Sequence, residues 1–140
     1  MRYSKSFKRK IETNLFGGII MTKTVFPRFR EQKGGHLIQG ASIGGLVGSV
    51  GRAHCAAAKF RVKGRSESLA KEIGSLGIKV TIIEPGGFRA DFASSSSELR
   101  KSRPEYQSTI GATVSFQPDY NGKQPGDLLK ASRLFAIWCH

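Results

Sequence analysis

The sequence of 140 residues has only two cysteines, Cys55 and Cys139, which lie far apart and without the spacing of metal ligands. This pattern predicts reduced thiols, no disulfide framework and no metal site, so we expect a cytoplasmic protein. The sequence also lacks any apolar run of about 18 residues, and we therefore expect no membrane-spanning helix. The basic N-terminus is not followed by a continuous apolar stretch and a small-residue cleavage site, so we expect no signal peptide.

Acidic residues are scarce, with 10 Asp and Glu against 23 Lys and Arg and a formal net charge of +13. The excess of positive charge is concentrated in residues 1–33. Such an excess attracts polyanions. However, the aromatic residues do not form a stacking pattern, and no zinc-finger or RNP-like motif is present. We therefore expect weak, salt-sensitive adhesion and no specific nucleic-acid binding.

Hydrophobic periodicity predicts an alternation of helices and strands. The spacing indicates a helix over Ile11–Gln32, with Pro27 kinking or dividing it, and a second helix over Ala53–Ile73. Short apolar runs indicate strands over His36–Ala41 and Lys79–Glu84. The order helix, strand, helix, strand predicts an α/β fold with a parallel strand pair and a right-handed crossover.

The two ends of the sequence are less regular. Residues 1–10 are basic and we expect them to be unstructured, and Ser94–Arg103 is typical of a mobile loop. We expect Phe116–Asp127 to be a loop that leads into a final helix, with Asp127 as its N-cap.

Three segments contain candidate residues for catalysis or cofactor binding: GHLIQGASIGG at 35–45, GRAHCAAAKF at 51–60, and IKVTIIEPGGFRAD at 78–91. In this order and spacing they resemble the second half of a short-chain dehydrogenase/reductase, a family of nicotinamide-dependent oxidoreductases. The resemblance implies a partial doubly wound, Rossmann-type parallel sheet with flanking helices. It divides a single partial domain, 1–140, into catalytic-half units (11–92), a substrate-lid loop (93–125) and a truncated C-terminal helix (126–140).

The resemblance also implies a catalytic set. The family's serine falls on Ser42 and its lysine on Lys59, while an asparagine of the preceding helix falls on Asn14. In the family a tyrosine transfers the hydroxyl proton during hydride transfer, and a lysine one helical turn later favours its ionised form. When the family pattern is laid on this sequence without gaps, its tyrosine falls on Cys55. It would fall on His54 only if one residue were inserted before Lys59. Read one by one, these residues are more typical of a turn serine, a solvated lysine, a helix-start asparagine and a small buried thiol.

The cofactor implied by the resemblance is NAD or NADP. Lys59 and the loop after the last predicted strand would face it, through Pro85, Gly86, Phe88 and Ala90. Ala90 stands where the family has a threonine, so one hydroxyl is missing there. The sequence also contains no Gly-x-x-x-Gly-x-Gly turn after an N-terminal strand, which is the element that holds the pyrophosphate.

Two functions follow from the resemblance. In the first, the chain is a truncated and catalytically impaired oxidoreductase acting on an alcohol or carbonyl substrate. The impairment arises because a cysteine side chain is several ångströms shorter than a tyrosine side chain, and about 1 Å of misplacement can cost a hundredfold in rate. In the second, the chain is a non-enzymatic remnant that associates with an intact relative through its two long helices. Either way, we expect a homo- or hetero-oligomer.

Overall fold

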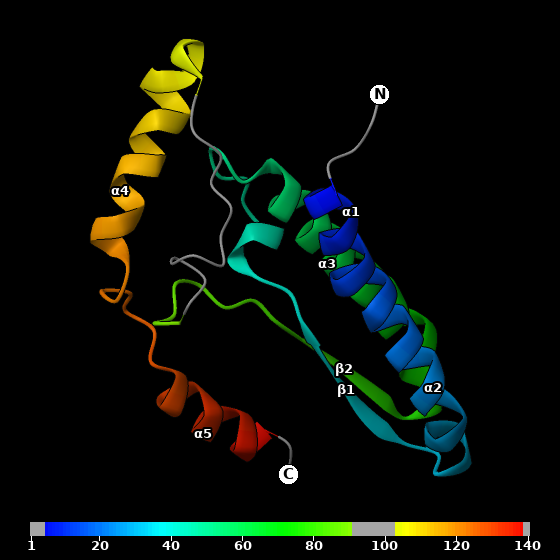
Figure 1. Ribbon diagram of the computed structural model, residues 1–140. Helices are drawn as coiled ribbons and strands as arrows, with labels where there is room; N and C mark the ends of the chain where they lie inside the picture. The colour runs from blue at the N-terminus through cyan, green and yellow to red at the C-terminus, as the bar shows by residue number, and fades with distance from the viewer. Residues whose placement is uncertain (1–4, 91–102, 139–140) are drawn as a thin grey trace. The chain divides into compact units, whose positions relative to one another are not determined.

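The computed structural model describes residues 5–90 and 103–138 (Figure 1). The chain divides into two compact units, Met1–Pro85 and Gly86–His140. The first unit contains the parallel strand pair and its helices, and the second contains the later helices. Among the described helices, none has both the length and the apolar character needed to cross a bilayer.

The first unit begins with a continuous helical segment. It consists of α1 (Lys5–Ile11), a π-helical stretch η1 (Glu12–Phe16) and α2 (Gly17–Glu31). The expectation of an unstructured start is therefore wrong for residues 5–10, while residues 1–4 lie outside the described chain. Pro27 does not divide α2. Because Pro27 is exposed, water can bond the carbonyl group that proline leaves without an intrahelical donor.

Strands β1 (Gly35–Gly40) and β2 (Ile78–Ile83) pair in parallel, with Gly35 opposite Ile78 and Gly40 opposite Ile83. Helix α3 (Ala53–Ile73) connects them, after a short 3-10 turn, η2 (Ile43–Gly45). The predicted order and the parallel pair are confirmed, and each strand lies one residue earlier than predicted. This arrangement is a partial Rossmann-type α/β fold.

Helices α2 and α3 cover the same face of the strand pair (Figure 1). Side chains alternate along a strand, so Leu37 and Gln39 of β1 share this face. The Gln39 amide donates a hydrogen bond of 3.2 Å to the buried Thr22 hydroxyl of α2. The core contains three buried side chains and five partly buried ones: Leu37, Ile73 and Ile78, with Val25, Phe26, Phe29, Leu69 and Val80.

The opposite face of the strand pair is more polar and more open. His36 and Thr81 are hydrogen bonded across the two strands at 2.8 Å. Ile38, on the same face, is 39% exposed. Within this unit, the free energy of apolar burial therefore comes from one face of the sheet.

The second unit contains the short helical turns η5 (Pro104–Tyr106) and η6 (Gln107–Gly111), followed by α4 (Ala112–Tyr120) and α5 (Leu128–Trp138). The prediction of a loop over Phe116–Asp127 is therefore wrong for residues 116–120, which belong to α4. The predicted N-cap is confirmed, because Asp127 Oδ1 accepts hydrogen bonds from the Leu129 and Lys130 amides at 2.9 and 3.2 Å. The start of the predicted lid, residues 93–102, lies outside the described residues.

A glycine turn connects α3 to β2 and provides a test of this packing. Gly77 has φ of +72°, and an added Cβ would lie 2.8 Å from the Lys33 carbonyl oxygen. We expect Gly77→Ala to lower the free energy of unfolding by at least about 1 kcal/mol, measured by urea denaturation. Gly64, in the middle of α3, has open space at the Cβ position. Gly64→Ala should instead raise the free energy of unfolding by about 0.5–1 kcal/mol. Equal effects of the two substitutions would contradict the turn geometry.

Candidate active site

The loops after β1 and β2 lie side by side at the carboxyl edge of the sheet. The strand pairing continues past the ends of the strands, because the Ala41 amide bonds the Ile83 carbonyl at 2.8 Å and the Ile43 amide bonds the Pro85 carbonyl at 3.0 Å. In open parallel sheets, ligands bind outside this edge. The geometry therefore places the Ser42 loop and Pro85 together where a ligand is expected.

Ser42 lies between those two hydrogen-bonded amides. Its backbone is extended, and its hydroxyl oxygen accepts a hydrogen bond of 3.2 Å from the Gly44 amide, which starts the η2 turn. The turn packs closely on α3, because a Cβ added at Gly45 would lie 3.0 Å from the Lys59 carbonyl oxygen. This contact brings the Ser42 loop against the part of α3 that carries Lys59.

Lys59 is half-buried and points to the end of β1. Its ammonium group donates a hydrogen bond of 3.0 Å to the Gly40 carbonyl, two residues before Ser42. Burial lowers the pKa of Lys59 below the ordinary lysine value, and the opposite charge of an ionised Cys55 partly offsets this by raising the pKa. Lys59 is thus a partly desolvated cation at the sheet edge and not a fully solvated helix charge.

Cys55 is half-buried one helical turn before Lys59 on α3. The Lys10 ammonium of α1 lies 3.7 Å from the Cys55 sulfur, so a second lysine, from a different helix than Lys59, contacts this thiol. Sequence reasoning missed Lys10. It stands at the end of a run of three basic residues, Lys8 to Lys10, in a stretch that was expected to be unstructured.

Asn14 lies in the π-helical stretch η1, one turn after Lys10. Its side-chain amide donates a hydrogen bond of 3.0 Å to the Lys10 carbonyl. Asn14 and Cys55 are therefore connected through Lys10, by its backbone on one side and by its ammonium group on the other. π-helical turns often occur at functional sites, which suits the role expected for Asn14.

His54 contacts a different neighbour. Its ring packs against Phe7 of α1, with ring centroids 4.9 Å apart and an interplanar angle of 49°. Positions i and i+4 share one face of a helix. This spacing favours Cys55 over His54 as the partner of Lys59, although the role of either residue stays a prediction.

The remaining predicted residues follow β2. Pro85 ends the first unit, whereas Gly86, Phe88 and Ala90 belong to the second. Phe88 forms an isolated parallel bridge with Gly126 in that unit. The expected contact of these residues with a cofactor stays a prediction.

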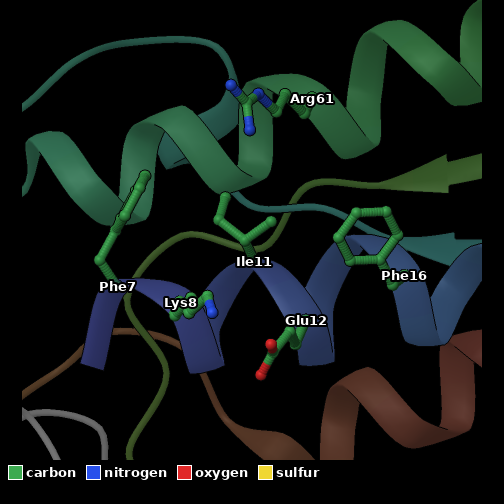
Figure 2. Close-up of a pocket in the computed structure, with 6 residues that line it drawn as sticks. All are labelled: Phe7, Lys8, Ile11, Glu12, Phe16 and Arg61. Atoms are coloured by element: carbon green, nitrogen blue, oxygen red, sulfur yellow. The ribbon is translucent and has the colours of Figure 1, made fainter. Parts of the chain in front are cut away.

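A groove runs between the N-terminal helical segment and α3 (Figure 2). In Figure 2, Phe7 and Ile11 point from the N-terminal segment toward α3, which contributes Arg61. The groove has a volume of about 390 Å³ and is lined by Phe7, Lys8, Ile11, Glu12, Phe16 and Arg61. None of the predicted catalytic residues lines it, so the groove is a feature of the helix pair and is separate from the Ser42 and Lys59 arrangement.

Comparisons with known proteins show the family to which the chain belongs. A family model described as short chain dehydrogenase matches residues 2–101. An oxidoreductase of Botryotinia fuckeliana is 43% identical over 106 residues, which cover 76% of this chain and 39% of that protein. A 3-ketodihydrosphingosine reductase of Bacteroides thetaiotaomicron is 33% identical, with 85% of this chain and 46% of that protein covered. The chain thus spans less than half the length of these curated relatives.

Solved structures of dehydrogenases are also similar to this chain over part of their length. A short-chain dehydrogenase from Streptomyces avermitilis superposes with a TM-score of 0.82 at 29% identity, covering 96% of this chain and 49% of that one. A 4-hydroxyisoleucine dehydrogenase complexed with NADH and succinate gives a TM-score of 0.56 at 28% identity, covering 81% of this chain and 50% of that one. The described fold therefore corresponds to about half of each of these structures.

The charge coupling between Cys55 and Lys59 can be measured. Because an ionised Cys55 raises the pKa of Lys59, we expect Cys55→Ser to lower the pKa of Lys59 further. An NMR titration of the lysine side chains, with Lys59→Arg used for assignment, measures this shift. The same midpoint for Lys59 in both proteins would contradict the coupling.

The lowered pKa has a consequence for stability. The unfolded chain holds the Lys59 proton up to the ordinary lysine pKa of about 10.5, while the folded chain releases it at lower pH. Between the lowered pKa of the folded state and the ordinary pKa of the unfolded state, the unfolded state binds more protons. In this pH range the contribution of Lys59 therefore raises the free energy of unfolding as the pH rises.

Proposed function

Because the chain belongs to the short-chain dehydrogenase family, we propose that it is the catalytic half of an oxidoreductase acting on an alcohol or carbonyl group with NAD or NADP. The observation that carries the proposal is the placement of Lys59 one turn after Cys55, with its ammonium group bonded to the Gly40 carbonyl at the end of β1, two residues before Ser42. Similar proteins support the substrate class, since they include a 3-ketodihydrosphingosine reductase and a retinol dehydrogenase.

In this proposal the chain's own residues handle the oxygen and proton of the substrate. The Ser42 hydroxyl orients the substrate oxygen, and the Lys59 ammonium supplies positive charge at the same edge. Cys55 occupies the position of the proton-transferring group. A thiol there has a short reach, so we propose that the chain transfers the proton poorly and is catalytically impaired.

The residues of this chain fit one end of the implied cofactor only. Lys59 and the Pro85–Ala90 loop would face the nicotinamide, which supplies the hydride when bound. The turn that holds a pyrophosphate has glycine-rich backbone amides before a helix, and the 140 residues contain no such turn after an N-terminal strand. We therefore propose that these 140 residues need a cofactor-holding half from elsewhere in order to act. The cytoplasmic location stays a prediction.

A chimera tests the role of Cys55. Residues 5–140, which include α1, would follow the first half of an intact relative. In this background, we expect Cys55→Tyr to raise carbonyl-reductase or alcohol-dehydrogenase turnover by about 10²–10⁴-fold, because a positioned general acid/base is restored. Turnover would be measured over several alcohols and ketones with both cofactors.

His54→Ala in the same chimera is the matched control. His54→Ala leaves position 55 and Lys59 unchanged, so turnover should change little in the variant that carries Cys55→Tyr. Loss of activity with His54→Ala, or equal turnover with Cys55 and Tyr at position 55, would show that the proton-transferring residue has been assigned wrongly.

A second candidate function, association with an intact relative through the long helices, is favoured by apolar exposure at the end of η1 and the start of α2. Phe16, Ile20 and Met21 are 52%, 62% and 67% exposed, and Phe16 also lines the groove between the helices. Neighbouring exposed apolar side chains of this size are typical of a surface that binds another protein. We propose that this surface, defined by Phe16, Ile20 and Met21, pairs with helices of a second copy or of a relative.

We expect the purified chain to be oligomeric, and we expect the double variant Ile20→Lys/Met21→Lys to shift it toward monomers. The reason is that a lysine buried at a helix pair leaves a charge without water or a partner. Light scattering after size-exclusion chromatography measures the change. Leu129→Lys, at a residue of α5 that is 74% exposed, is the control and should leave the mass unchanged. A monomeric parent chain would argue against this surface as an interface.

A further inference from the structure

Two segments of the second unit that are far apart in sequence are connected by their backbones. The Gly126 amide donates a hydrogen bond of 2.9 Å to the Gly87 carbonyl, and the Arg89 amide donates one of 3.1 Å to the Gly126 carbonyl. Together they form the parallel bridge between Phe88 and Gly126. The loop after β2 is therefore attached to the residues just before α5.

The Arg89 side chain reinforces this attachment. One guanidinium nitrogen donates to the Gln124 carbonyl at 2.8 Å, and another donates to Asp127 Oδ2 at 2.9 Å. The other oxygen of the same carboxylate caps α5. A planar guanidinium can bind two acceptors at once in a fixed geometry, which a lysine cannot. We call the contacts of Gly87 and Arg89 with Gln124, Gly126 and Asp127 the Arg89 clamp.

Glycine is required where the two backbones meet. A Cβ added at Gly126 would lie 2.6 Å from the Gly87 carbonyl oxygen and 2.8 Å from the Phe88 ring. At Gly87, an added Cβ would overlap the Tyr120 hydroxyl. The close approach of the two backbones is therefore specified by the sequence at Gly126, in addition to the charged pair, whereas the end of the Tyr120 side chain can move away from position 87.

We propose that Arg89 is a positioning residue that holds the cofactor-facing loop in place by connecting it to the start of α5. The proposal rests on the proposed function, which assigns Gly86, Phe88 and Ala90 to this loop. The clamp binds the backbone at 87 and 89 and so fixes the chain direction on both sides of Phe88 and immediately before Ala90. A single exposed ion pair contributes little, but here it acts together with three backbone-directed hydrogen bonds.

Amide hydrogen exchange on the 140-residue chain tests the clamp directly. We expect Arg89→Met to speed hydrogen exchange about tenfold at two backbone amides, that of residue 89 and that of Gly126, because charged hydrogen bonds are lost. Asp127→Ser should have the same effect on these two amides while leaving the first turn of α5 protected, because serine is a good N-cap and is too short to reach Arg89. Arg28→Met, which removes an exposed ion pair with Glu31 in α2, is the control and should change neither amide. Unchanged exchange at both amides in the Arg89 and Asp127 variants would overturn the clamp.

The positioning role is tested in the chimera described above, by the dissociation constant for NADH followed through nicotinamide fluorescence. Arg89→Met should weaken NADH binding about tenfold, and Arg89→Lys should not restore it, since a lysine ammonium lacks the rigid planar fork that holds both acceptors in a fixed geometry. Faster amide exchange with unchanged NADH affinity would overturn the positioning role and leave the proposed function intact. A chimera with Arg89 present that does not bind NADH would contradict the proposed function, and the positioning role with it.

Discussion

The parallel pairing of β1 and β2 is the interaction on which the rest of the first unit depends. It extends beyond Gly40 through the amides of Ala41 and Ile43, and this extension sets the Ser42 loop beside Pro85. The core behind it is small, because α2 and α3 cover one face and the apolar cluster there contains three buried side chains among the described residues. The position of the candidate active site is thus a direct consequence of strand register, since a shift of one residue would turn Leu37 and Gln39 away from the helices.

The electrostatic character of the site comes from three helical positions. Lys59 is held at the sheet edge by the Gly40 carbonyl, and its partial burial lowers its pKa. The Lys10 ammonium of α1 contacts the Cys55 thiol, and the Asn14 side chain donates a hydrogen bond to the Lys10 backbone carbonyl. The Cys55 thiol lies 3.7 Å from the Lys10 ammonium, and its side chain is several ångströms shorter than that of a tyrosine. The proposed impairment is therefore a matter of reach more than of charge.

Much of this arrangement could be predicted from the sequence. Both ends of α3 were predicted, and the strands lie within one residue of their predicted positions, because glycine and proline mark their limits. The α1 helix was missed because its support is tertiary: Phe7 packs on His54, and Lys10 contacts Cys55. The Pro-Asp and Asn-Gly pairs at 118–122 indicated a loop, but α4 continues to Tyr120. The Arg89 clamp connects residues more than thirty positions apart, and no local pattern in the sequence indicates such a contact.

The central claim is that these 140 residues provide the substrate and nicotinamide side of an oxidoreductase and lack the side that holds the pyrophosphate. Titration of NADH into the purified chain and into the chimera with a relative's first half, followed by nicotinamide fluorescence, tests it most directly. The account predicts saturable binding by the chimera and no binding at micromolar concentrations by the chain alone. Saturable micromolar binding by the chain alone would contradict it.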